Sequence, residues 1–267
     1  MRIHLMTDLE GVAGIVNHYD YCRPESRYYE QARVLLTAEV NAAVDGFFAG
    51  GATDVVVFDG HGPGAVNCEL LDERAKFSRG HYSPIWPWGL DDGFDAFAII
   101  GQHAKSGTPY SHLTHTGAFS VYDLSVNGLS IGEYGTLVLC AKELGIPAIF
   151  AAGEKAFAEE AEALTPGVVT VAVKRGLRPD DGHAHATPEE YSKAKLSAEH
   201  LTPAAARKKI RAGAKLAVER LISNPKQFNH PDLKAPWHII RRFRPLNVGL
   251  IQHAKDDKSF IAALNKL

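Results

Sequence analysis

The chain has 267 residues, 45% of them hydrophobic, and a formal net charge of -2. This length and apolar content suffice for a sizeable core, in one large domain or in a core domain with a smaller companion. The near-neutral charge gives no electrostatic basis for binding nucleic acid or an anionic membrane surface.

Targeting and redox signals are absent from the sequence pattern. No apolar run approaches the roughly 18 residues of a membrane-spanning helix, and no signal-peptide pattern stands at the N-terminus. The three cysteines, Cys22, Cys68 and Cys140, are scattered and include no Cys-x-x-Cys pair. This usage argues against a disulfide framework and fits a reducing compartment. We therefore expect a cytoplasmic protein that does not contact a membrane.

The first two thirds of the chain alternate between strand and helix patterns. Strands are expected at residues 2–7, 54–58, 95–100 and 148–152, and helices at residues 28–49 and 133–144. The first helix carries apolar residues at helical spacing and ends at Gly50-Gly51, a typical C-terminal cap. Continuous apolar strands separated by helices predict an α/β fold, with a mostly parallel sheet covered by helices on both faces.

The pattern changes after about residue 165. A strand is expected at residues 168–176, followed by a polar, exposed excursion at residues 178–195. Thr202 and Pro203 are typical of the N-cap and first position of a long basic helix that reaches about Ser223. Strands at residues 237–243 and 248–253 and a helical tail complete the pattern. We expect a Rossmann-like domain over residues 1–165 and a smaller α+β domain over residues 166–267.

Acidic and imidazole side chains follow the predicted strands. In a parallel α/β sheet, ligands bind beyond the carboxyl ends of the strands, so these side chains converge on one edge. They are Asp8, Glu10, Asp59, His61 and His103, together with Glu133 at the start of a helix. Mixed carboxylate and imidazole groups at such an edge suit zinc or a similar divalent ion.

The spacing of Asp8 and Glu10 supports this metal-site interpretation. In an extended backbone they point to the same side, and two aligned carboxylates repel each other unless a cation lies between them. Gly11 and Gly14 let the chain turn away above the pair. Five ligands exceed one tetrahedral zinc and suit two metals that share a bridging carboxylate, activate a water and polarise a carbonyl.

Each of these residues also has an ordinary structural interpretation. Acids after strands often solvate a loop or cap a helix, and Glu133 would stabilise a helix dipole without any metal. His112 and His115 lie in the polar segment 111–117, which is either a solvated loop or the source of a catalytic histidine above the metal edge. Segment 59–65 is glycine-rich but lacks the G-x-G-x-x-G spacing.

Several motifs in order resemble the D-aminopeptidase family, sometimes described as dipeptide-transport protein A. They are TDLEGVAG, YEQARVLLTAEVNAA, FDGHG, GQHAKSGTP, THTGAF and GEYGTLVLCAKELGIPAIFAAGE. The resemblance covers about residues 1–175 and resumes near residues 200–206. It implies a Rossmann-like domain with a smaller α/β domain, a ring-shaped decamer, and removal of an N-terminal D-residue such as D-Ala from short peptides.

The resemblance also implies a role for each site residue. Asp8 matches the carboxylate that bridges two zinc ions, Glu10 and His61 match ligands of one zinc, and His103 and Glu133 match ligands of the other. His115 matches the catalytic histidine, a nucleophile or proton carrier. Asp59 could orient a ligand imidazole.

Two segments depart from the family pattern, the insertion at residues 178–196 and the short C-terminal part beyond about residue 225. The expected function is a dinuclear zinc D-aminopeptidase. Two alternatives stay open: a related metal-dependent amidase or esterase acting on another amino-acyl compound, and a non-catalytic peptide-binding protein linked to transport.

Overall fold

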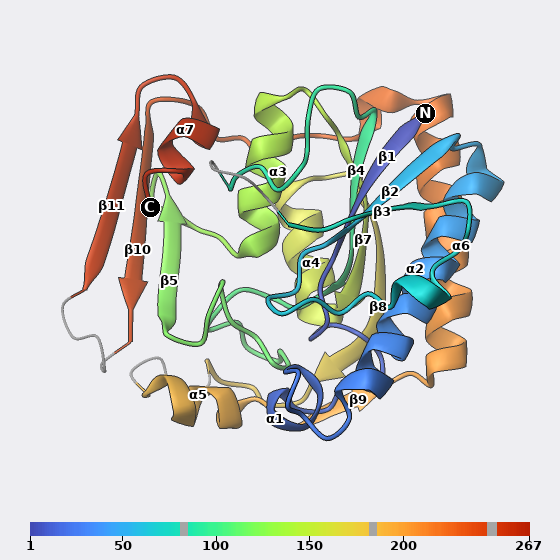
Figure 1. Cartoon of the computed structure of the whole chain (residues 1–267). Coiled ribbons are helices and arrows are strands. Elements are labelled where there is room, and N and C mark those ends of the chain that lie inside the picture. Colours follow the sequence, from blue (N-terminus) through green and yellow to red (C-terminus); the bar gives the residue numbers. More distant parts are fainter. Residues whose placement is uncertain (81–84, 182–185, 245–249) are drawn as a thin grey trace.

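The computed structural model describes residues 1–80, 85–181, 186–244 and 250–267. A seven-stranded sheet with strand order β3-β2-β1-β4-β7-β8-β9 forms the centre of the molecule (Figure 1). Its strands are β1 (Arg2–Thr7), β2 (Asp54–Asp59), β3 (Lys76–Ser78), β4 (Ala96–Gln102), β7 (Ala148–Glu154), β8 (Val169–Gly176) and β9 (Ala198–His200). Only β9 pairs antiparallel with its neighbour among the described strands of this sheet. The α/β fold with a mostly parallel sheet is thereby confirmed.

Helices cover both faces of this sheet, as the apolar strands predict. Helices α2 (Tyr29–Gly50) and α6 (Pro203–Ser223) pack together on one face, and α3 (Glu133–Glu143) and α4 (Lys155–Leu164) lie on the other (Figure 1). Alternate residues of β1 divide between the two layers: Ile3 and Leu5 face α2 and α6, whereas Met6 faces α3 and α4. Burial of apolar side chains on both faces stabilises the sheet.

A second, antiparallel sheet stands apart with strand order β11-β10-β5-β6. Its strands are β5 (Val121–Val126), β6 (Leu129–Ser130), β10 (Trp237–Phe243) and β11 (Ile251–Asp256). Helix α7 (Phe260–Leu264) packs against it, and α3 lies between the two sheets (Figure 1). Leu139 and Cys140 of α3 face this smaller sheet, so one helix joins both cores.

Each of the two sheets contains residues from both sides of the boundary expected at residue 165. Strand β8 and helix α6 join the large sheet, whereas β5 and β6 join the small one. The excursion expected to be exposed at residues 178–195 contains helix α5 (Pro188–Ala194), in which Tyr191 is buried. A capping box between Thr187 and Glu190 begins this helix. The prediction of an exposed excursion is therefore wrong at Tyr191 and Ser192, which are buried, and correct at Glu189, Glu190 and Lys193. Residues 182–185 lie outside the described residues.

The remaining elements are short. They are α1 (His18–Tyr21) and the 3-10 turns η1 (Cys68–Leu70) and η2 (Pro225–Gln227). Strand β11 begins later than the predicted 248–253, of which residues 248 and 249 lie outside the described residues. Within the described ranges, no helix combines the length and apolar character required to cross a bilayer.

Candidate metal centre

The predicted site residues meet at the carboxyl edge of the large sheet. Thr7, the last residue of β1, is level with Asp59 on one neighbouring strand and with Ile100 on the other. The chain segments that leave these three strands therefore emerge side by side. The five expected ligands lie there together with His115. They are Asp8, Glu10, His61, His103 and Glu133.

The Asp8 carboxylate lies between two imidazole rings. Its Oδ1 is 3.2 Å from His61 Nδ1, and its Oδ2 is 3.3 Å from His103 Nε2. Each oxygen therefore faces a different ring, which is the arrangement expected of a carboxylate shared by two cations.

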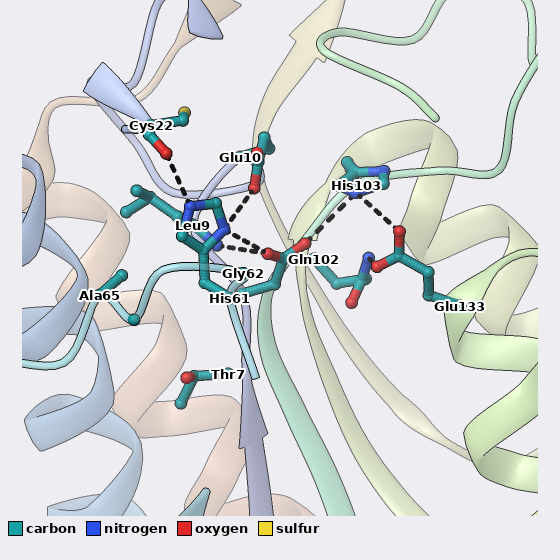
Figure 2. Close-up of polar contacts among 12 residues, drawn as sticks. Thr7, Leu9, Glu10, Cys22, His61, Gly62, Ala65, Gln102, His103 and Glu133 are labelled. Carbon is teal, nitrogen blue, oxygen red and sulfur yellow. Dashed lines mark hydrogen bonds and ion pairs between the residues drawn. The ribbon is translucent and has the colours of Figure 1, made fainter. Parts of the chain in front are cut away.

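The carboxylates of Glu10 and Glu133 lie on opposite sides of Asp8, one beside each imidazole ring. Glu10 Oε2 is 3.2 Å from His61 Nδ1, and Glu133 Oε1 is 3.5 Å from His103 Nε2. Figure 2 shows His61 between Cys22 and Glu10, with His103 facing Glu133 on the other side. The Gln102 amide donates to Glu133 Oε2 at 3.0 Å and orients that carboxylate.

Backbone carbonyls fix which nitrogen of each ring faces the cluster. His61 Nε2 is 3.0 Å from the Cys22 carbonyl, and His103 Nδ1 is 2.9 Å from the Ala104 carbonyl. A carbonyl can only accept, so these nitrogens donate and the other nitrogen of each ring points toward the carboxylates. In metal sites, a hydrogen bond from the ring nitrogen that does not bind the metal commonly orients the histidine in this way.

Electrostatics show that the cluster is unsatisfied by its own side chains. Burial and the Glu10 carboxylate raise the pKa of Asp8 to about 7. Burial alone would lower the pKa of His103, but the neighbouring carboxylates, Glu133 first and then Asp8 and Glu10, raise that pKa to about 10. Burial is likewise outweighed at His61, whose pKa Glu10 and Asp8 raise well above its ordinary value. Without a metal, bound protons on these side chains therefore offset the negative charge of the carboxylates. A divalent cation would neutralise that charge more effectively.

Orphaned atoms test whether a metal fits. Asp8 Oδ2, Glu10 Oε2 and His103 Nε2 are buried, and their ion-pair contacts lack hydrogen-bond geometry, so none of the three makes a hydrogen bond among the described residues. Buried polar atoms without partners are costly, and three in one cluster indicate a missing ligand. Carboxylate oxygen and imidazole nitrogen are the donors that zinc accepts. The residues present therefore fit zinc.

Close backbone packing holds the ligand segments at this edge. Gly101 of β4 has a φ of +75°, and a Cβ there would lie 2.0 Å from the Asp8 carbonyl oxygen. Gly11 N donates to the Gly101 carbonyl at 2.7 Å. The segment that carries Asp8 and Glu10 is thus pressed directly against β4.

The segment predicted to supply a catalytic histidine does reach this edge. The His115 ring stacks on the His103 ring, with centroids 3.9 Å apart and planes inclined by 19°. His115 Nδ1 donates to the Leu113 carbonyl at 2.9 Å, so Nε2 of the neutral ring carries no proton. Burial and the charge of His103 lower the pKa of His115 to about 4. The His115 ring is thus neutral at pH 7.

Two other polar residues considered from the sequence, one after a strand and one in segment 111–117, contact the backbone instead. Asp59 accepts from the amides of Ala65 and Val66 and contacts Arg79; in the described structure it does not orient the His61 ring. His112 donates from its backbone amide to Glu154 and contacts the Val16 carbonyl. Neither side chain lies within the metal cluster.

Other residues of the site carried no sequence signal. His18 of α1 lies 3.4 Å from Glu10 Oε1 and reaches it only through folding. Buried Lys174 of β8 donates to the carbonyls of Glu10 and Ile15 and so supports the Glu10 segment from behind. Glu39 of α2 accepts from the Ala13 amide at 3.0 Å.

A cavity of about 800 Å³ opens onto the cluster. At one end the cavity is lined by residues of the cluster, namely Asp8, Glu10, His61, His115 and Glu133. Other lining side chains come from the segment before β4, from the smaller sheet and from α7; they include Trp86, Trp88, Leu124, Arg241, Phe243 and Leu264. This volume is within the range of pockets that enclose small-molecule ligands.

Comparisons with known proteins match this architecture. A family model described as D-aminopeptidase matches residues 1–244. A D-aminopeptidase of Bacillus subtilis (strain 168) is 32% identical over 179 residues, which span 66% of this chain and 65% of the relative. The chain thus matches slightly less than two thirds of that relative's length.

A solved structure shares the fold. It is described as the Zn-dependent D-aminopeptidase DppA from Bacillus subtilis, a self-compartmentalizing protease. The TM-score is 0.81 at 22% identity, over 100% of this chain and 95% of that one. With the family model matching most of the sequence, the chain belongs to the D-aminopeptidase family.

Proposed function

We propose that the protein is a dinuclear zinc aminopeptidase that removes the N-terminal D-residue, of the D-Ala type, from short peptides. The observation that carries the proposal is the position of Asp8, whose two oxygens face His61 and His103 separately. Family membership favours the peptidase reaction, and the Zn-dependent structural relative favours zinc.

The chain would hold two zinc ions. Asp8, Glu10 and His61 would bind one ion, and Asp8, His103 and Glu133 the other. When bound, such a pair supplies an activated water and polarises the scissile carbonyl.

His115 would move the proton in this reaction. Its unprotonated Nε2 lies 3.9 Å from Glu133 Oε1, at the rim of the cluster and within the cavity wall. From there it would take a proton from the attacking water and deliver it to the leaving amine. The Leu113 carbonyl holds the ring in the tautomer that this role requires.

We also propose that the chain assembles into a closed homo-oligomer, a ring-shaped decamer. Its support is the family resemblance and the description of the structural relative as self-compartmentalizing. Three free cysteines favour a reducing, cytoplasmic location. Light scattering on the purified protein tests the assembly, and a monomer would exclude it.

Stereochemistry and the free amine distinguish this function from its alternatives. The zinc-loaded protein should hydrolyse D-Ala-D-Ala, and should act poorly on L-Ala-L-Ala and on N-acetyl-D-Ala-D-Ala. Equal rates on the N-acetylated peptide would indicate a general amidase. Binding of the peptide without hydrolysis would indicate the peptide-binding protein.

A further inference from the structure

Arg241 is a charged residue in an apolar row of strand β10. Residues two apart on a strand share a face, so Arg241 follows Trp237 and Ile239, both of which are buried in the core of the smaller sheet. Arg241 and Phe243 then line the cavity that contains the metal cluster. The row therefore runs from the core of the smaller sheet to the wall of the cavity, and Arg241 is its first residue at that wall.

The partners of Arg241 leave its charge uncompensated. It donates to Gln252 Oε1 at 3.2 Å, and it makes no ion pair with an acidic side chain of the described structure. Burial lowers the pKa of Arg241, and no carboxylate opposes that effect. A partly buried guanidinium with five N–H donors is costly unless an anion pairs with it.

Arg242, the next residue of the strand, has its charge compensated by a carboxylate. Arg242 points to the opposite face, where it forms an ion pair with Asp123 at 2.7 Å and also donates to Ser125 Oγ at 3.2 Å. Arg242 does not line the cavity of the metal cluster. Two adjacent arginines thus differ in one respect: only the one facing this cavity lacks a carboxylate partner in the described structure.

We propose that Arg241 binds the C-terminal carboxylate of the peptide substrate. The inference rests on the proposed function, which places the amino end of the peptide at the metal cluster. A short peptide carries one further obligatory charge, the carboxylate at its other end, and the guanidinium fork matches a carboxylate in two parallel hydrogen bonds. The cavity would therefore select short peptides with a free C-terminus over blocked or long ones.

Arg23 also lines the cavity but is poorly placed for this task. Its Nε donates to His18 Nε2 at 3.1 Å, and His18 in turn contacts Glu10 of the cluster. Arg23 is thus on the side of the cavity where the amino end would bind.

The experiment compares D-Ala-D-Ala with its C-terminal amide on the zinc-loaded enzyme. In Arg241→Met, KM for the acid should rise by about 10- to 100-fold, the value of a hydrogen bond between charged groups. KM for the amide should change little. Arg242→Met is the matched control and should leave both substrates unaffected. Arg241→Lys keeps the charge without the fork and should restore part of the preference for the acid.

Other results would overturn the inference. Equal losses on acid and amide in Arg241→Met, at unchanged zinc content, would mean that Arg241 only supports the fold. A selective loss on the acid in Arg23→Met, but not in Arg241→Met, would assign the carboxylate to Arg23. Should Arg241→Met fail to fold, Arg241→Lys decides, because an unchanged preference for the acid would exclude the fork.

Direct binding separates this inference from the proposed function. If the native enzyme cleaves neither peptide, the proposed function is wrong. Calorimetric titration of both peptides into the zinc-loaded protein then still tests Arg241. Tighter binding of the acid that is lost in Arg241→Met would support the carboxylate site, and equal affinities for acid and amide would refute it.

Discussion

The His115 ring lies on the His103 ring at a centroid distance of 3.9 Å, so the charge of one ring affects the pKa of the other. His103 points Nε2 toward Asp8 and Glu133. A positive charge on His103, or on a metal beside it, keeps a proton off His115. The proposed ligand and the proposed base are therefore in contact, and a charge on the first keeps the second neutral.

Removal of the His115 ring should strongly reduce turnover without removing zinc. In His115→Ala we expect kcat to fall by at least about 100-fold, since a positioned base contributes on that scale. Zinc content should equal that of the native protein. His238→Ala is the control, because His238 contacts His253 outside the cavity and should leave the rate unchanged. Native turnover in metal-replete His115→Ala would remove His115 from the mechanism.

Zinc binding should release protons at pH 7. The pKa values of His61 and His103 are raised and that of Asp8 is raised to about 7, so the zinc-free protein holds protons there. Zinc requires deprotonated ligands, so zinc affinity should fall as the pH is lowered. Calorimetry in buffers of different ionisation enthalpy measures the released protons. Identical heats in all buffers would contradict this prediction.

Glu39 should make stability depend on pH in a defined direction. Burial raises the pKa of Glu39 from 4.5 to about 8 in the folded state. The folded state therefore binds the extra proton between these values, and the stabilisation present below pH 4.5 is lost as the pH rises through about 8. Glu39→Gln keeps an acceptor for the Ala13 amide and has no proton to lose.

Relative to the native protein, Glu39→Gln should therefore gain more than about 1 kcal/mol of unfolding free energy between pH 5.5 and pH 8.5. Urea denaturation at the two pH values, with both proteins in the same zinc buffer, measures this gain. A difference between the proteins that does not vary with pH would argue against a protonated Glu39.

Substitution of Gly101 should be destabilising both because of its positive φ and because a side chain there would clash with the backbone of Asp8. Gly101 and Gly107 have similar φ values, +75° and +79°. A Cβ at Gly101 would strike the Asp8 carbonyl oxygen, whereas nothing lies within 4 Å of one at Gly107. Gly107→Ala should cost about 1–2 kcal/mol of backbone strain. Gly101→Ala should cost more and should also weaken zinc binding, measured by denaturation and by zinc titration. Equal costs with equal zinc affinity would refute the proposed contact.

The large sheet and the metal cluster could be anticipated because both follow from short-range patterns. The apolar runs of β1, β2 and β4 predict parallel strands, and parallel strands bring their carboxyl ends to one edge. Asp8, His61 and His103 therefore had to be neighbours once the sheet was right. The proposal that His115 is the base came from the family resemblance, because its polar loop alone is equally consistent with a solvated segment.

The parts that escaped prediction depend on contacts between distant segments. Residues 121–126 alternate over only four positions, and as β5 they pair both with nearby β6 and with β10, which lies more than a hundred residues away in the sequence. Buried Tyr191 contacts residues far from it in the sequence: its hydroxyl accepts from the Gly107 amide, and the Arg244 guanidinium lies over its ring. His18 joins the cluster from a four-residue helix with no pattern of its own.

The measurement that tests the central claim most directly is the zinc content of the native protein and of Asp8→Ala, both purified without chelator and resupplied with zinc. Elemental analysis should give about two zinc ions per native chain. Because Asp8 faces both His61 and His103, Asp8→Ala should lose both ions, whereas Glu10→Gln and Glu133→Gln should each weaken one. A native protein that binds no zinc, or an Asp8→Ala protein that retains two ions, would contradict the shared-carboxylate site.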